Sequence, residues 1–273
     1  MSYKNKHEVL KRKDWDSRES VTKDRYKSKR GQIENQLEKE ALVCALNDKR
    51  YEYALDVGIG DGRLVQVYAP YIDRLLGIDI SENQLKYAIK HTNILDIDIE
   101  FKVCGDASKL EVSSHNISEN KFYTEIKETG KSKNGLPSNS FDLVICSRVL
   151  QHVENWQLAL AEQCRVLKPG GSLLLLLYNR FSIYGLKKLY EHLFINPLKG
   201  NFRNPLNIRR ELNKNGFIIE YYAGALMAQP ELFPNNLSTR EESFIRWVEK
   251  FGKIAPFKYF GGRQVILAKK SNM

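Results

Sequence analysis

The sequence has little cysteine and no long apolar run, and both absences limit the class of protein. Its four cysteines, Cys44, Cys104, Cys146 and Cys164, show no C-x-x-C spacing, so neither a zinc site nor a disulfide framework is expected. The longest aliphatic run, Leu173 to Leu177, is too short to cross a bilayer. The first residues are densely charged, unlike a secretory signal peptide. These features predict a globular cytoplasmic protein with no membrane association and no bound metal.

Positive charge is in excess, but it is concentrated at the N-terminus. The formal net charge is +10, and residues 1–30 hold eleven Lys/Arg and five Asp/Glu, which is +6 of that total. We therefore predict a basic arm over residues 1–31, followed by one domain over residues 32–273. The arm could contact RNA or an acidic partner. The interpretation we favour is a solvated amphipathic lead-in helix that partly covers a cofactor, since Trp15 and Tyr26 indicate that it packs on something.

What the chain does contain is an acidic turn with glycine at alternate positions. The run Tyr53 to Val57 predicts a buried strand, and Gly58, Gly60 and Gly62 follow it. Glycine accepts positive φ and carries no Cβ, so such a turn can bend sharply and open a helix with free N–H groups. A nucleotide-like cofactor is the ligand expected there. An ordinary strand-to-helix turn without a ligand is the alternative.

Two side chains separate this turn from the dinucleotide-binding fingerprint. Arg63 stands where that fingerprint has its third glycine, so the helix cannot approach its strand as closely as the fingerprint requires. Asp61 places a carboxylate near the helix N-terminus, where it would repel a pyrophosphate. A cofactor without phosphate groups is therefore favoured.

Asp79 is the binding residue that the sequence indicates best. Residues 74–79 (RLLGID) are typical of a buried strand that ends in this carboxylate, which can accept hydrogen bonds from ribose hydroxyls. A helix N-cap is the alternative role, but Ser81 and Gln84 form the capping box of the next helix and are expected to leave Asp79 free.

Strands and helices alternate along the predicted domain. Apolar periodicity predicts helices at 32–46, 62–69, 82–91 and 155–167, and strands at 53–58, 74–79, 99–103, 141–146, 171–178, 216–221 and 263–269. Strands separated by helices predict a parallel sheet with right-handed crossovers. The fold class is therefore α/β, as a Rossmann-like three-layer αβα sandwich.

Five segments, in order, resemble the class I S-adenosylmethionine-dependent methyltransferases. They cover roughly residues 41–180 and are LDVGIGDG, GIDIS, VCGDASKL, FDLVICSRVLQHV and LKPGGSLLLL. The resemblance implies a seven-stranded, mostly parallel sheet with a C-terminal antiparallel hairpin. It also implies an enzyme that uses S-adenosylmethionine as its cofactor.

The resemblance, together with the glycine turn, assigns the positions that contact this cofactor. They are Asp56, Gly58, Gly60, Gly62, Asp79, Ile80, Asp106, Ala107 and Ser147. In this family the acid matching Asp79 holds the ribose, and the acid matching Asp106 accepts from the adenine amino group. Acids on one side and backbone N–H groups on the other suit a ligand with a sulfonium, an ammonium and a carboxylate. A local turn cap is the alternative role for Asp106, and a solvated loop position is the alternative for Ser147.

Two stretches are additional to a minimal domain. Residues 111–135 form a polar insertion with four acidic residues and four lysines, which we interpret as a disordered surface loop, with a lid or a partner contact as alternatives. Residues 181–215 mix aromatic and basic side chains and are predicted to be a cap that roofs the acceptor pocket. A pair of amphipathic helices packed on the sheet is a compatible interpretation.

The implied reaction is attack by a nucleophile on the cofactor's methyl group, with S-adenosylhomocysteine as the leaving group. Alignment in a desolvated pocket supplies most of the acceleration, so only some acceptors need a base. His152 is the candidate base, with a pocket-wall role as the alternative. Arg148 is expected to be an exposed loop arginine, with binding of an acidic acceptor as the alternative, whereas Tyr178 and Asn179 are candidates to face the acceptor.

The predicted function is therefore methyl transfer to an O, N or C nucleophile of a small molecule. An RNA (tRNA) or protein methyltransferase that uses residues 1–30 is the alternative. The D/N/S-P-P-aromatic motif, which the family uses for amino groups of nucleobases and glutamine, is absent, since residues 146–149 read CSRV. A dehydrogenase-like or non-catalytic protein is a third class, and Arg63 argues against the dehydrogenase. The sequence indicates neither the acceptor nor the oligomeric state.

Overall fold

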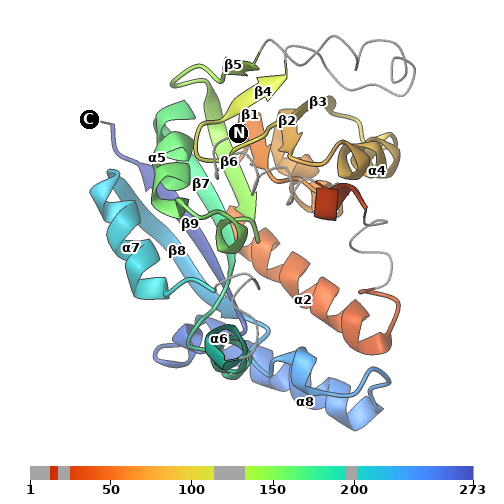
Figure 1. Cartoon of the computed structure of the whole chain (residues 1–273). Coiled ribbons are helices and arrows are strands. Elements are labelled where there is room, and N and C mark those ends of the chain that lie inside the picture. The colour runs from red at the N-terminus through yellow and green to blue at the C-terminus, as the bar shows by residue number, and fades with distance from the viewer. Residues whose placement is uncertain (1–12, 18–24, 114–132, 195–201, 273) are drawn as a thin grey trace.

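A seven-stranded sheet with the order β3-β2-β1-β6-β7-β9-β8 forms the centre of the molecule (Figure 1). The structure is a computed structural model that describes residues 13–17, 25–113, 133–194 and 202–272. The strands are β1 (Tyr51–Val57), β2 (Ile72–Asp79), β3 (Asp98–Val103), β6 (Phe141–Ser147), β7 (Leu167–Tyr178), β8 (Phe217–Ala225) and β9 (Arg263–Lys270).

Side-chain alternation in the strands gives the sheet two apolar faces. In β7, Leu173, Leu175 and Leu177 join one core cluster, whereas Leu174 and Leu176 join the cluster on the opposite face. Successive strand residues point to opposite sides, so an unbroken leucine run is what a strand covered on both faces requires.

Helices cover both faces and complete a three-layer sandwich. α5 (Trp156–Val166) and α7 (Pro205–Lys214) pack on one face, and α2 (Lys29–Leu46), α3 (Val65–Tyr68) and α4 (Glu82–Thr92) pack on the other. The N-terminal half of α2 also packs against α8 (Thr239–Glu249). Further helices are α6 (Ile183–Phe194) and the short 3₁₀ turns η1 (Ala69–Tyr71), η3 (Leu150–His152), η4 (Pro230–Leu232), η5 (Lys250–Lys253) and η6 (Phe257–Tyr259), and residues 13–16 are helical as well.

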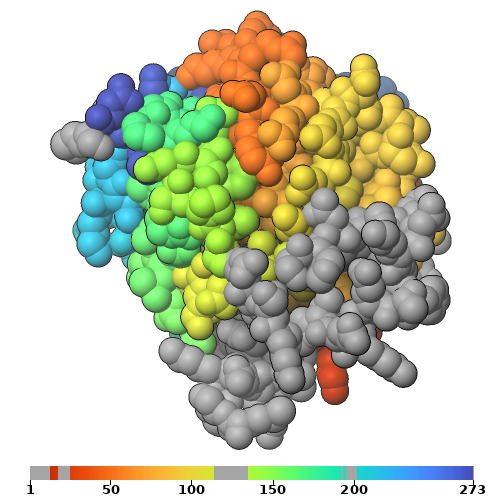
Figure 2. Space-filling model, turned by 90° about the horizontal axis from the view of Figure 1, so that it is seen from above, coloured from red at the N-terminus to blue at the C-terminus, as the bar shows by residue number. Residues whose placement is uncertain are grey.

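The strand order places a topological switch point between β1 and β6. The chain runs from β1 outward through β2 to β3, then returns to pair β6 with the other side of β1. In the view from above, the orange and yellow N-terminal segments accordingly lie on one side and the green to blue segments on the other (Figure 2). Open α/β sheets bind ligands beyond the carboxyl ends of the strands at such a point.

The predicted fold class and hairpin are confirmed, with local differences. β1, β2, β3, β6 and β7 pair in parallel, and β9 lies antiparallel between β7 and β8. β7 begins at Leu167 instead of residue 171, because the KPGG segment continues the strand through a shift of register. The predicted helix 62–69 is reduced to α3 and η1, since positive φ extends to Gly62.

The additional stretches contain regular structure. The ends of the insertion pair as a second sheet, β4 (Glu111–Ser113) with β5 (Lys133–Gly135), and residues 114–132 lie outside the described residues. In the cap, α7 packs through Ile208 and Leu212, whereas α6 leaves Leu186 and Leu193 exposed. Two amphipathic helices are therefore present, but only α7 packs on the sheet.

Within the described residues, no helix combines the length and the apolar character that crossing a bilayer requires. The same residues contain no group of three or more His, Cys, Asp or Glu side chains arranged to hold a metal ion.

Candidate functional site

The glycine turn after β1 lies against the end of β2 and the loop after β6. The N–H groups of Gly58 and Ile59 donate to the carbonyl of Ile78 at 2.8 and 3.0 Å. Gly58 has φ of +75°, and a Cβ there would lie 2.3 Å from Cγ2 of Val149. Gly60 has φ of +59°, and a Cβ there would meet no atom within 4 Å. The turn is therefore closed toward β6 and open at Gly60.

Asp79, at the end of β2, is joined to this turn. Its Oδ2 accepts from the N–H of Gly60 at 2.9 Å, and its Oδ1 accepts from the N–H of Ser81 at 2.9 Å. The prediction that Asp79 stays free is wrong, because both of its carboxylate oxygens already accept hydrogen bonds from backbone N–H groups. Each oxygen retains a second lone pair, so the carboxylate can still accept from a diol. Burial raises the pKa of Asp79 to about 6 despite these hydrogen bonds.

Two buried polar atoms lie at the ends of β1 and β6 without partners among the described residues. Oδ2 of Asp56 accepts from the hydroxyl of Tyr68, whereas Oδ1 of Asp56 and Oγ of Ser147 have no hydrogen-bond partner within those ranges. Burial raises the pKa of Asp56 to about 7. Unpaired buried polar atoms cost free energy, so these two atoms fit a ligand that brings hydrogen-bond donors such as an ammonium group.

Asp106 lies near Asp79, since the N–H of Cys104 after β3 donates to the carbonyl of Asp79 at 2.8 Å. Oδ1 of Asp106 accepts from the N–H and the hydroxyl of Ser108 at 2.8 and 2.6 Å, which is the local cap that we gave as the alternative. In the part of the chain that the structure describes, Oδ2 accepts no hydrogen bond. The adenine-binding role of this acid stays a prediction, as do the roles of the half-buried Ile80 and Ala107.

The arm bridges two loops of the site. Asp16 accepts a hydrogen bond from the hydroxyl of Ser81 at 2.6 Å. The ring of Trp15 stands edge-on to the ring of the exposed His152, with centroids 5.4 Å apart. Residues 13–17 therefore lie across the loop after β2 and the loop after β6, as a covering segment would. The role of His152 as a base stays a prediction.

The segment beyond α6 is tied to the loop that carries His152. Nη2 of Arg203 donates to the carbonyls of Leu150 and Val153 at 3.0 and 2.7 Å. The neighbouring Phe202 stacks on Tyr178, the last residue of β7, with ring centroids 4.5 Å apart. Part of the predicted cap is thus anchored at the carboxyl ends of β6 and β7.

Two predictions about side chains on this side are wrong. Asn179 is fully buried, and its Nδ2 donates to the carbonyls of Tyr259 and Gly261 at 2.8 Å each, so it holds a loop instead of facing an acceptor. The side chain of Arg148 is only 17% exposed, and its Nη1 donates to the hydroxyl of Tyr26 at 3.0 Å.

Comparison with known proteins identifies the family. A family model described as a methyltransferase domain matches residues 29–222, which is more than half of the chain. The chain belongs to this methyltransferase family. The resemblance to S-adenosylmethionine-dependent methyltransferases is confirmed, and the residues around the glycine turn fit the cofactor of that family.

Relatives of this methyltransferase domain are distant. The human mitochondrial ubiquinone biosynthesis O-methyltransferase is 29% identical over 182 residues, which are 63% of this chain and 43% of the human protein. A ubiquinone/menaquinone biosynthesis C-methyltransferase of Francisella tularensis subsp. novicida is 31% identical over 122 residues, which are 37% of this chain and 49% of that protein. The match therefore spans less than half the length of either relative.

The solved structures support the fold. A SAM-dependent methyltransferase from Thermotoga maritima superposes with a TM-score of 0.54 at 17% identity, over 87% of this chain and 91% of that chain. At this identity the likeness shows the fold alone.

Two buried acids of α2 were not predicted from the sequence. Glu34 and Glu38 are buried, and Arg263 of β9 contacts their carboxylates at 3.0 and 3.2 Å. They lie four residues apart, next to the buried Ile33 and Leu37. Two acids at helical spacing within an apolar stripe were the signal that could have found them, because buried carboxylates require partners.

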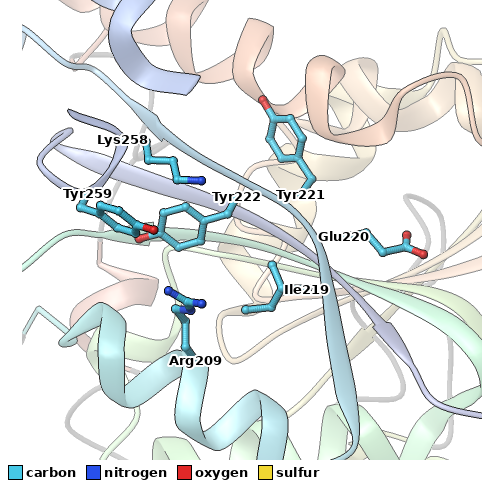
Figure 3. A pocket seen from close by; sticks show the side chains of 7 residues that line it. All are labelled: Arg209, Ile219, Glu220, Tyr221, Tyr222, Lys258 and Tyr259. Carbon is cyan, nitrogen blue, oxygen red and sulfur yellow. The ribbon is translucent and has the colours of Figure 1, made fainter. Parts of the chain in front are cut away.

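A cavity lies beside the edge strand β8, between α7 and η6 (Figure 3). Its volume is about 260 Å³, and its lining consists of Arg209, Ile219, Glu220, Tyr221, Tyr222, Lys258 and Tyr259. None of the predicted cofactor-binding residues lines it, so it is separate from the candidate site.

We expect Gly60→Ala to weaken S-adenosylmethionine binding by about tenfold or more while the protein stays folded, because the added Cβ would enter the open side of the turn. The strained φ costs only about 1–2 kcal/mol. Gly216→Ala is a matched control, since Gly216 has φ of +76° and open space around its Cβ but lies far along the chain at the start of β8. Calorimetry and thermal denaturation of both variants test this expectation, and equal loss of affinity in both would contradict it.

Cofactor affinity is expected to fall as the pH is lowered from about 8 to about 5. The pKa values of Asp79 and Asp56 are raised to about 6 and about 7, so both carboxylates gain protons within this window. Protonation removes the charge that a cationic ligand requires. The free energy of unfolding of the unliganded protein should instead rise as the pH falls through this window, because the folded state binds these protons more tightly than the unfolded state. Calorimetric titrations across this range that show constant affinity would contradict the assignment of both acids.

Proposed function

We propose that the protein transfers the methyl group of S-adenosylmethionine to an O, N or C nucleophile of a small molecule. The observation that carries this proposal is the hydrogen bond that joins Gly60 to Asp79 at the carboxyl ends of β1 and β2, with Oδ1 of Asp56 beside the same turn and without a partner among the described residues. The carboxylate of Asp79 suits a ribose diol, and Oδ1 of Asp56 suits the ammonium group of the methionine part. Family membership supports the same cofactor.

In the mechanism that we propose, the protein binds and aligns two reactants. S-adenosylmethionine supplies an activated methyl group when bound. Asp79 and the glycine turn would hold the cofactor, and Trp15, whose ring stands edge-on to that of His152, would help to exclude water. With a hydroxyl or amine acceptor, His152 would take the proton that the nucleophile loses. Orientation of this kind is worth on the order of 7–11 kcal/mol.

The contacts of the arm favour a small acceptor over RNA. Arg25 binds Glu34 through a short ion pair, and Arg30 donates to the carbonyl of Phe233 at 2.7 Å. These basic groups are engaged within the protein. The two curated relatives described above are named for ubiquinone or menaquinone biosynthesis, which supports a small-molecule acceptor.

Labelled methyl transfer tests the function. The full chain would be incubated with a metabolite extract and S-adenosylmethionine carrying a deuterated methyl group, and small molecules would be searched by mass spectrometry for the label. Asp79→Ala, expected to bind the cofactor poorly, serves as the control. Label found in added RNA and in no small molecule would favour the alternative acceptor. Absence of cofactor binding by calorimetry would refute the proposal.

We also propose a reducing location such as the cytoplasm. All four cysteines are free thiols, and Cys104 and Cys146 are buried. Cell fractionation that places the protein in an oxidising compartment would contradict this.

A further inference from the structure

Four arginines and three glutamates meet where α2, the loop after β6 and the start of β9 come together. This arginine cluster consists of Arg25, Arg63, Arg148, Arg263, Glu34, Glu38 and Glu231. With every side chain ionised, the described residues of the cluster carry one positive charge in excess. Buried charges are normally paired, so an excess of positive charge at this place suits an anionic ligand.

The carboxylates of the cluster are committed mainly to its two most buried arginines. Arg263 is fully buried and contacts Glu231, Glu34 and Glu38 at 2.7, 3.0 and 3.2 Å. Arg63, whose side chain is 8% exposed, contacts Glu38 at 2.8 Å. These two arginines hold α2 on the sheet, and they are matched by the acids.

Arg25 and Arg148 have fewer carboxylate contacts. Arg25 forms a short ion pair with Glu34, but Arg263 shares that carboxylate. Among the described residues, Nε of Arg25 is buried without a hydrogen-bond partner, and its Nη1 donates to the neutral hydroxyl of Tyr178 at 3.0 Å. The Arg148 guanidinium donates one hydrogen bond among the described residues, to the hydroxyl of Tyr26, and its nearest carboxylate oxygen, on Glu38, is 3.7 Å away. These two side chains are also 32% and 17% exposed, so the unmatched charge lies on the open side of the cluster.

The backbone of Arg148 and the phenol of Tyr178 both indicate that this arrangement of arginines has a specific role. Arg148 has φ of +57°, a left-handed conformation that non-glycine residues adopt at a cost and that clusters at functional sites. Burial raises the pKa of Tyr178, but Arg263, Arg148 and Arg25 outweigh this effect and lower the pKa. A positive potential is therefore present at the carboxyl ends of β6 and β7.

We propose that Arg25 and Arg148 bind a carboxylate group of a ligand at the carboxyl ends of β6 and β7. Guanidinium groups form short, charge-assisted hydrogen bonds with carboxylates, often in pairs, and one carboxylate would cancel the excess charge of the cluster. The proposal rests on the proposed methyl transfer, which offers two sources of a carboxylate. One is the acceptor, which would lie beyond β6 and β7. The other is the methionine part of the cofactor, which would lie beside the glycine turn.

Calorimetry on the full chain tests the site and tells the two sources apart. The wild type, Arg148→Met, Arg148→Lys and Arg25→Met would be titrated with S-adenosylmethionine and with 5′-methylthioadenosine, which lacks the carboxylate. Each protein, loaded with S-adenosylhomocysteine, would also be titrated with benzoate and with the uncharged benzamide. Arg209→Met, which changes an exposed arginine of α7, is the control and should bind all of these probes as the wild type does.

If the bound carboxylate belongs to the cofactor, Arg148→Met should bind S-adenosylmethionine about tenfold or more weakly than the wild type does. Its affinity for 5′-methylthioadenosine should be unchanged. If the bound carboxylate belongs to the acceptor, Arg148→Met should bind S-adenosylmethionine and 5′-methylthioadenosine as the wild type does. Its affinity for benzoate should be lost. Arg148→Lys should restore part of either loss. Arg148→Met should remain as stable as the wild type, because it removes the excess charge. If S-adenosylmethionine binds the wild type and both methionine variants equally, and benzoate binds no better than benzamide, the site does not exist. If S-adenosylmethionine does not bind the wild type, the proposed function has failed, and this inference fails with it.

Discussion

Replacing Asp79 with alanine is expected to lower the affinity for S-adenosylmethionine by about two orders of magnitude. A hydrogen bond to a charged acceptor is worth about 1.5–3 kcal/mol, so the loss of two bonds from a ribose diol corresponds to roughly 100-fold or more. The variant also removes the acceptor that fixes the N–H of Gly60 at 2.9 Å, so the turn itself loses its anchor. Calorimetry should be done near pH 8, since the pKa of Asp79 is about 6 and the acid must be ionised.

Two further variants serve as controls for Asp79→Ala. Asp73→Ala removes an acid from the other end of β2, where the exposed side chain pairs with Arg50 at 3.0 Å, and it should bind the cofactor as the wild type does. Asp79→Asn keeps one carbonyl acceptor without the charge and should give an intermediate affinity. If Asp79→Ala binds as tightly as the wild type, this acid does not hold the cofactor.

The sequence was sufficient for the elements that local pattern determines. The leucine run of β7 and the apolar run before Gly58 each predict a strand, because side-chain alternation within a few residues decides what a strand buries. The N-cap of α4 is also local, since Ser81 accepts from the N–H of Gln84 three residues later. The parallel pairing of β1, β2, β3, β6 and β7 followed from the alternation of strands with helices.

The sequence was not sufficient where a side chain's partner is distant. Arg263 and Glu38 are 225 residues apart, and no short-range pattern joins them. Arg148 was expected on the surface because its neighbours in sequence form a loop, but its partner Tyr26 comes from the N-terminal arm. Asp79 was expected to be free because its partner, the N–H of Gly60, belongs to another turn. Each error comes from tertiary contacts at the site, where backbone and charges from several segments converge.

Glu38→Gln is expected to destabilise the protein by about 3–5 kcal/mol, the usual cost of removing one partner from a buried ion pair. Glu38 is fully buried, and its carboxylate lies 2.8 Å from Arg63 and 3.2 Å from Arg263. Burial raises the pKa of Glu38, but the charges of Arg148, Arg63 and Arg263 outweigh it and hold the pKa well below its usual range. Thermal denaturation near pH 7 should show a Tm lower by about 10 °C, from roughly 2–4 °C per kcal/mol for a chain of this size.

Two controls separate charge pairing from general disturbance of α2. Glu40→Gln, on the exposed side of the same helix, removes a charge but keeps an oxygen that can accept from Gln36, and it should shift the free energy of unfolding by less than about 0.5 kcal/mol. The stability that Glu38 contributes should be lost as the pH falls below about 4.5, since a carboxyl with a lowered pKa in the folded state stabilises only while the unfolded state is also ionised. The difference in Tm between wild type and Glu38→Gln should therefore shrink in acid.

A double-mutant cycle measures the coupling between Glu38 and Arg148. Arg148→Met should restore part of the stability lost in Glu38→Gln, because it reduces the number of cations that the missing carboxylate leaves unpaired. Strict additivity of the two changes, or equal Tm values for Glu38→Gln and Glu40→Gln, would mean that the arginines do not depend on this acid. In that case the excess charge at Arg148 would have no electrostatic cost, and nothing would require a bound carboxylate to balance it.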